Sequence, residues 1–307
     1  MPIPVEKIIA GFAGEDSSLL NSELIELSNL NSEEMSSFES SWPSVRPERR
    51  QQIVDRLVEL AEDNLELNFD AIFKSCLKDG DDEVRAKAIE GLWENEEASL
   101  IDPLIGLLEQ DGSERVQEAA AVALGNYAML AEYNKLRHCY VSKVHQALLE
   151  AIEDKKKAVE VTRRALEAAA PVSLPEVREA IGNAYKSGIP GLKVSSIYAM
   201  GKSCDPVWLP VLLSELSSAD AEMRFEAAGA CGELEEEEAV PYLITTVDDS
   251  DVDVRMAAIR ALGKIGNAQA KECLRQCLES NSEAVRQAAE QALNMVEADE
   301  DPLSFRL

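Results

Sequence analysis

The sequence is poor in the residues that most often bind metals or nucleic acids. Its 307 residues include 2 histidines, and aromatic residues make up 5%. Lysine and arginine number 30 against 58 aspartates and glutamates, which gives a formal net charge of −28. An acidic surface repels phosphate groups, so we expect neither nucleic acids nor anionic membranes as ligands. The charge either keeps the protein soluble or matches a basic partner.

Motifs for membrane insertion, export and nucleotide binding are also missing. The chain has no run of about 18 uncharged apolar residues, which a membrane-spanning helix needs. The segment MPIPVEKIIAGFAG lacks the basic and apolar regions of a signal peptide. Neither G-x-x-x-x-G-K-[ST] nor G-x-G-x-x-G occurs, so no nucleotide is indicated. The six cysteines lack the spacing of a disulfide framework. We therefore expect a protein of the reducing cytoplasm.

The histidines and cysteines do not form a convincing metal or catalytic motif. His138, Cys139 and His145 lie in the segment LAEYNKLRHCYVSKVHQ, but a metal site wants three or four converging ligands. A nucleophilic cysteine beside a histidine would need a third, orienting group. Cys273 and Cys277 are four residues apart, which on a helix favours packing. We expect no catalytic residues, no metal and no cofactor.

What the chain does have is an internal repeat. The segments DDEVRAKAIEGL at 81–92, DVDVRMAAIRAL at 251–262 and NSEAVRQAAEQAL at 281–293 share an apolar residue, a basic residue and then alanine. Aligned copies place the basic position at Arg85, Gln117, Thr162, Lys193, Arg224, Arg255 and Arg286. The last five are 31 apart, and the steps before them are 32 and 45. The long step indicates an insertion near 128–150.

The columns around this anchor position describe one face of a helix. The residue before it is apolar in all seven copies, the third after it is small, and the seventh is apolar in most. A shorter apolar helix precedes each anchored helix, as at Val240–Thr246. Glu290 replaces an apolar residue in the last copy, as a terminal repeat requires.

The fold class that follows is an all-α solenoid, a stack of antiparallel helix pairs. We expect residues 1–68 to form a helical cap that contains a degenerate repeat anchored at Arg50. Residues 69–296 should form about seven repeats, and residues 297–307 an acidic, disordered tail.

The segment DVDVRMAAIRALGKIG at 251–266 resembles HEAT repeats of the phycobilisome-lyase-like subtype, and the resemblance extends over roughly 69–296. It implies that the anchored helices line the concave side. It also implies an Asp–Arg ladder between repeats, with Arg85, Arg224, Arg255 and Arg286 as its arginines and Lys193 as a partial match. Gln117 and Thr162 depart from the pattern, so the ladder should be interrupted in the middle.

The resemblance leaves more than one function open. Members of the subtype include subunits that attach or remove bilin chromophores, and others are scaffolds. A chromophore-handling, lyase-like subunit is therefore our second hypothesis. Related DNA-repair glycosylases use a basic groove, and the charge of this chain excludes one.

Our first hypothesis is a non-catalytic protein-binding scaffold. Val194, Tyr198, Phe225 and Met256 lie one or five positions after the anchors of successive repeats. They would form one apolar patch on the concave face, and such patches mark protein-binding sites. The alternative is that helix rotation buries these positions between repeats. Trp93 and Tyr127 are secondary candidates. The partner would be another protein, and the acidic charge favours one with a basic surface.

Overall fold

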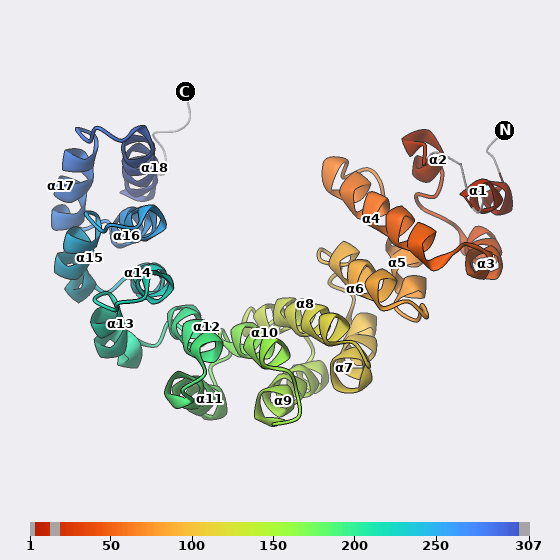
Figure 1. Ribbon diagram of the computed structural model, residues 1–307, viewed down its shortest axis with the longest axis horizontal. Coiled ribbons are helices and arrows are strands. Elements are labelled where there is room, and N and C mark those ends of the chain that lie inside the picture. The colour runs from red at the N-terminus through yellow and green to blue at the C-terminus, as the bar shows by residue number, and fades with distance from the viewer. Residues whose placement is uncertain (1–3, 13–18, 301–307) are drawn as a thin grey trace. The chain divides into compact units, whose positions relative to one another are not determined.

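The computed structural model describes residues 4–12 and 19–300 (Figure 1). These residues form eighteen α-helices and four short 3-10 helices, without a strand. None of the described helices is both long and apolar enough to cross a membrane. The chain divides into two compact units between Val161 and Thr162. The predicted all-α solenoid is confirmed, and each unit is described by itself below.

Unit 1 begins with short helices and continues as stacked helix pairs. α4, which we assigned to the cap, packs against α6, and α6 in turn packs against α8. The predicted insertion corresponds to the end of α8 and most of α9, which packs on both α7 and α8. The elements are α1 (Val5–Phe12), α2 (Asn21–Ile25), α3 (Ser32–Ser41), η1 (Trp42–Ser44), α4 (Pro47–Asp63), α5 (Asp70–Cys76), α6 (Asp82–Gly91), η2 (Ala98–Leu100), α7 (Ile101–Gln110), α8 (Glu114–Glu132) and α9 (His138–Glu153).

Unit 2 is more regular and contains two rows of helices (Figure 1). The row that carries the repeat anchors consists of α12, α14, α16 and α18, and each packs on the next. We call it the second-helix row; α11, α13, α15 and α17 each pack against the helix that follows them. The elements are α10 (Val159–Ala169), α11 (Pro175–Lys186), α12 (Pro190–Lys202), η3 (Pro206–Trp208), α13 (Leu209–Glu215), α14 (Ala221–Leu234), η4 (Glu237–Ala239), α15 (Val240–Thr246), α16 (Val252–Ile265), α17 (Ala268–Cys277) and α18 (Glu283–Glu300).

The boundaries of these helices follow local side-chain chemistry. The carboxylates of Asp81, Asp220 and Asp251 each accept a hydrogen bond from a backbone N–H in the first turn of the next helix. Gly266 ends α16 in the left-handed conformation, with φ of 61°. α18 continues to Glu300, and the remainder of the expected tail, 301–307, lies outside the described residues.

Neighbouring helices of the second-helix row approach each other to backbone contact. Gly232 in α14 faces Ala261 in α16, and a Cβ on the glycine would lie 2.8 Å from the alanine Cα. The same glycine–alanine pair recurs one repeat earlier at Gly201, and one repeat later at Gly263. This close packing fixes the rotation of each helix, and with it the side chains that reach the surface.

Candidate functional site

Two of the predicted ladder arginines form ion pairs with the following repeat. Arg224 Nε and Nη2 donate to the carboxylate of Asp249 at 2.7 and 2.8 Å. Arg85 binds Asp111 in the same way, at 2.8 and 2.7 Å. Both carboxylates also accept a backbone N–H two residues later, from Asp251 and Ser113. Each aspartate therefore ties the arginine of one repeat to the turn of the next.

The other ladder positions keep only part of this arrangement. Arg255 and Arg286 donate to the backbone carbonyls of Asp249 and Ser280, each six residues earlier. Gln117 donates to the carbonyl of Asp111, also six residues earlier. Lys193 pairs with Glu215 at 2.8 Å. A role shared by five of the seven anchor residues is thus to bond the carbonyl six residues earlier, in the turn before their own helix: Arg85, Gln117, Arg224, Arg255 and Arg286. Their contacts are with the chain's own turns and carboxylates.

The central apolar candidates do not all reach the surface. Tyr198 on α12 is 38% exposed, and Phe225 on α14 and Met256 on α16 are half-buried. Val194 is buried, so the expectation that it contributes to a surface patch is wrong. Its side chain packs within the row, as the burial alternative described. We call Tyr198, Phe225 and Met256 the α12–α16 surface.

Glu226, next to Phe225 on α14, is a largely desolvated carboxyl group. Burial, together with the nearby carboxylates Glu167 and Glu222, raises its pKa to about 7, although Arg163 acts in the opposite direction. Glu226 forms no hydrogen bond with another residue of the described chain. Its carboxylate is therefore poorly compensated at neutral pH.

The groups around Glu226 are engaged with each other. Glu167 on α10 accepts hydrogen bonds from Ser195 Oγ at 2.5 Å and from Arg164 at 2.8 Å. Arg163 Nε donates to Ser195 Oγ at 2.9 Å. This network joins α10 to α12, and Arg163 compensates the charge of Glu226 only in part.

Glu233, two helical turns further along α14, is by contrast a well-compensated carboxylate. Its carboxylate pairs with Lys202 Nζ at 2.8 Å and Lys264 Nζ at 3.0 Å. Burial raises the pKa of Glu233, but the hydrogen bonds from the two lysines outweigh it, so the pKa is lowered. Lys202 Nζ also lies 5.7 Å from the ring centroid of Tyr198. The α12–α16 surface therefore lies beside one carboxylate that two lysines compensate, Glu233, and one that is only partly compensated, Glu226.

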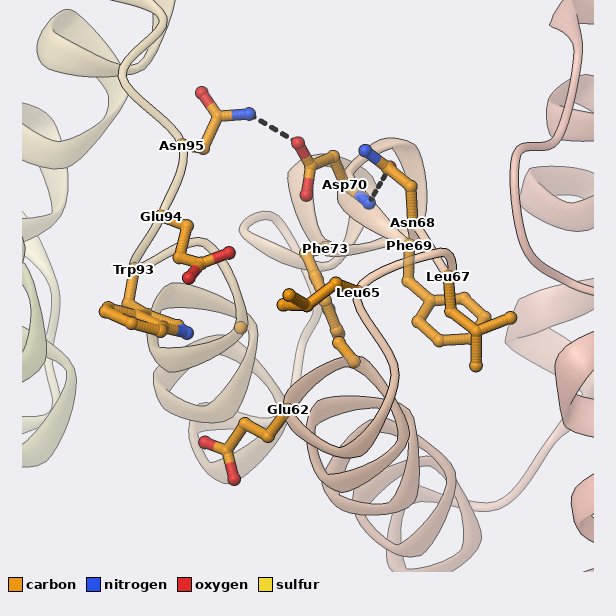
Figure 2. Close-up of a pocket in the computed structure, with 12 residues that line it drawn as sticks. Glu62, Leu65, Leu67, Asn68, Phe69, Asp70, Phe73, Trp93, Glu94 and Asn95 are labelled. Carbon is orange, nitrogen blue, oxygen red and sulfur yellow. Dashed lines mark hydrogen bonds between the residues drawn. The ribbon is translucent and has the colours of Figure 1, made fainter. Parts of the chain in front are cut away.

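The two secondary candidates lie in unit 1 and differ from each other. Trp93 is 58% exposed and lines a cavity (Figure 2). Tyr127 is buried, so the expectation that it contacts a partner is wrong. Its hydroxyl donates toward the carbonyls of Asn95 and Glu97 at 3.0 and 3.1 Å. It holds the loop that carries Trp93, a role that its position in the repeat did not reveal.

Glu226 is the functional candidate that the sequence did not single out. Carboxylates are frequent in this chain, and the spacing of the repeat does not separate a desolvated one from a solvated one. Among the described residues, no group of three or more His, Cys, Asp or Glu side chains is placed to hold a metal ion. His145 is partly buried, and burial lowers its pKa.

Comparisons with solved structures find other proteins that resemble this chain in fold. Kap95, in its complex with Nup1, matches 95% of this chain over 46% of its own length, at 13% identity and a TM-score of 0.53. The phycocyanin lyase complex of CpcE and CpcF from Nostoc sp. matches 75% of this chain over 94% of its own chain, at 19% identity and a TM-score of 0.47. The Escherichia coli protein YibA matches 78% of this chain over 96% of its own chain, at 16% identity and a TM-score of 0.48. These likenesses concern the fold alone.

The family comparison rests on the sequence itself. No curated protein matches the chain. Residues 69–153 and 209–294, together more than half of the chain, match the family described as HEAT repeats. The chain belongs to the HEAT-repeat family.

Proposed function

We propose that this protein is a non-catalytic scaffold whose α12–α16 surface binds a basic segment of another protein. The observation that carries the proposal is the position of Glu226, a half-buried carboxyl group next to Phe225 and among half-exposed apolar side chains. A lysine or arginine from a partner would add counter-charge to the partial compensation that Arg163 provides. Kap95, which shares the fold, occurs in a complex with the protein Nup1.

The mixed character of the surface supports a protein ligand. Three successive helices of the second-helix row, α12, α14 and α16, carry Tyr198, Phe225 and Met256. Tyrosine, phenylalanine and methionine are enriched in protein interfaces. An ion pair that forms where water is partly excluded is stronger than one in open solvent. The apolar residues would provide contact area, and Glu226 would select a cation.

The proposal can be tested by affinity capture with the full chain from its own cells, followed by mass spectrometry. Tyr198→Ala combined with Phe225→Ala should remove the specific partner. A control variant with Tyr242→Ala and Val207→Ala removes two exposed apolar side chains from α15 and η3 instead. It should leave capture intact. Circular dichroism melting checks that both variants remain folded.

The charge component has its own variant. Glu226→Gln keeps the shape of the side chain and removes the charge, so a purified partner should bind several-fold more weakly and with less dependence on salt. If capture by the Tyr198→Ala, Phe225→Ala protein equals that by the unmodified protein, the α12–α16 surface is not the binding site.

A further inference from the structure

A cavity of about 440 Å³ lies in unit 1, between the end of α4 and the loops before α5 and after α6 (Figure 2). Two large apolar side chains beside it are open to solvent, Leu65 at 84% and Trp93 at 58% exposure. Glu62 and Glu94 line it as well, and Figure 2 shows the carboxylate of Glu94 between Leu65 and Trp93, and Glu62 farther along α4. An aromatic ring and carboxylates thus border the same cavity.

The loop that carries Trp93 is held in place before any ligand arrives. Asn126 Nδ2 on α8 donates to the carbonyl of Trp93 at 3.1 Å. The Tyr127 hydroxyl donates to the carbonyl of Asn95, and Asn95 Nδ2 donates to Asp70 across the cavity at 2.6 Å. A ligand would therefore lose little free energy to ordering of this loop.

The segments around the cavity contain no cation of their own. No lysine or arginine occurs between Arg56 and Lys74, or between Lys87 and Arg115. Lys74 is engaged with Glu97 at 2.8 Å. Lys87 lies 2.9 Å from Glu90 and 3.3 Å from Asp55. Glu62, at the end of α4, and Glu94, in the loop after α6, therefore line the same cavity as an exposed indole and have no basic neighbour in their own segments.

We infer that this cavity binds an arginine side chain from a flexible segment of a partner protein. The planar guanidinium stacks on the face of Trp93 and pairs with Glu62 and Glu94. The aliphatic part of the arginine contacts Leu65. Arginine fits better than lysine because its flat, delocalised group can stack and form two parallel hydrogen bonds at once. The two glutamates disfavour an anionic or purely apolar ligand.

This site is independent of the α12–α16 surface, which lies in unit 2. The probe is a synthetic peptide, acetyl-Gly-Leu-Arg-Leu-Gly-amide, and its control is the same peptide with citrulline, which keeps the shape of arginine without its charge. Binding is followed in the full chain by the indole N–H resonance of Trp93 in ¹H–¹⁵N spectra. Trp93→Phe assigns that resonance, and the buried Trp42 and half-buried Trp208 serve as internal references.

We expect the arginine peptide to shift the Trp93 resonance in a saturable manner and the citrulline peptide to leave it in place. Glu62→Gln with Glu94→Gln should weaken binding about threefold or more. The matched variant, Glu66→Gln with Glu96→Gln, removes two exposed charges from the loops that follow α4 and α6. Neither residue lines the cavity. It should bind nearly as the unmodified chain does.

Three results would overturn the inference. An equal response to the citrulline peptide would show that charge is not recognised. Equal weakening by both double variants would show diffuse attraction to an acidic surface and no defined site. An unchanged Trp93 resonance at saturating peptide would show that the cavity is not used. Because Tyr198→Ala with Phe225→Ala leaves this cavity intact, failure of the proposed scaffold surface would be seen separately.

Discussion

Arg224 and Asp249 are 25 residues apart in the chain, yet the guanidinium forms two hydrogen bonds of 2.7 and 2.8 Å to the carboxylate. Both side chains are more than four-fifths buried. A bidentate pair in this setting adds a directional contact between two repeats that also meet through apolar side chains and through the Glu233–Lys264 pair. Arg255 occupies the same position one repeat later, where Ser280 replaces the aspartate.

This difference predicts unequal costs for the same substitution. Arg224→Lys keeps the charge but loses the forked geometry, and we expect a loss of about 1–3 kcal/mol in the free energy of unfolding. Arg255→Lys removes hydrogen bonds to backbone carbonyls alone and should cost about 1 kcal/mol or less. Urea unfolding of both variants measures the costs, and equal values would contradict the role assigned to Asp249.

The same pair predicts a dependence on pH. The hydrogen bond from Arg224 lowers the pKa of Asp249. A carboxyl group with a lowered pKa contributes stability above its unfolded pKa of about 4, and this contribution is lost as the pH falls through the lowered value. The gap in stability between the unmodified chain and Arg224→Lys should therefore narrow below about pH 4.

Ser280→Asp should complete the ladder at the position where this chain interrupts it. Ser280 Oγ already accepts the backbone N–H of Ser282 at 3.2 Å, as Asp249 accepts that of Asp251. We expect a gain of about 1 kcal/mol through a new pair with Arg255. Ser280→Asn is the uncharged control and should not give this gain. An equal gain in the Arg255→Lys background would mean that the ion pair is not the cause.

The sequence predicted the helix pairs because buried positions repeat every 31 residues with apolar or small side chains. It also contained a signal that we did not use, since Gly201, Gly232 and Gly263 share that spacing. What it could not predict is the rotation of each helix. Val194 and Phe225 occupy equivalent columns, yet the first is buried and the second half-buried. Such a difference depends on side chains from neighbouring repeats, which one helix pattern does not contain.

The glycine–alanine contacts predict a strongly position-dependent effect of adding one methyl group. A Cβ on Gly232 would lie 2.8 Å from the backbone of Ala261, so α14 and α16 would have to separate. We expect Gly232→Ala to cost about 1–3 kcal/mol through overpacking. Gly229, three residues earlier on α14, has nothing within 4 Å of its Cβ position. Gly229→Ala should stabilise the helix by up to about 1 kcal/mol. Thermal unfolding compares the two, and similar shifts would contradict the close contact.

The last prediction concerns Glu226. Burial and nearby carboxylates raise the pKa of this residue from 4.5 to about 7. A raised pKa means that folding favours the protonated form. The contribution of protonated Glu226 to the stability of the native state is therefore complete below about pH 4.5. It is lost as the pH rises toward and past 7. Glu226→Gln cannot ionise, so it should escape this loss. After allowance for partial solvent exposure, we expect it to be about 1–2 kcal/mol more stable than the unmodified chain at pH 8.

At pH 4.5 the two proteins should unfold at nearly the same temperature, because Glu226 is then protonated and resembles glutamine in charge. The measurement is the difference in melting temperature between the two proteins at each pH. Glu222→Gln, an exposed neighbour on the same helix, serves as the matched control and should show a smaller change with pH. If the benefit of Glu226→Gln were equal at pH 4.5 and pH 8, desolvation of a charged Glu226 would not be its origin. A partner cation that pairs with Glu226 should reverse the effect, since it would lower the pKa and make the ionised glutamate the more stable form.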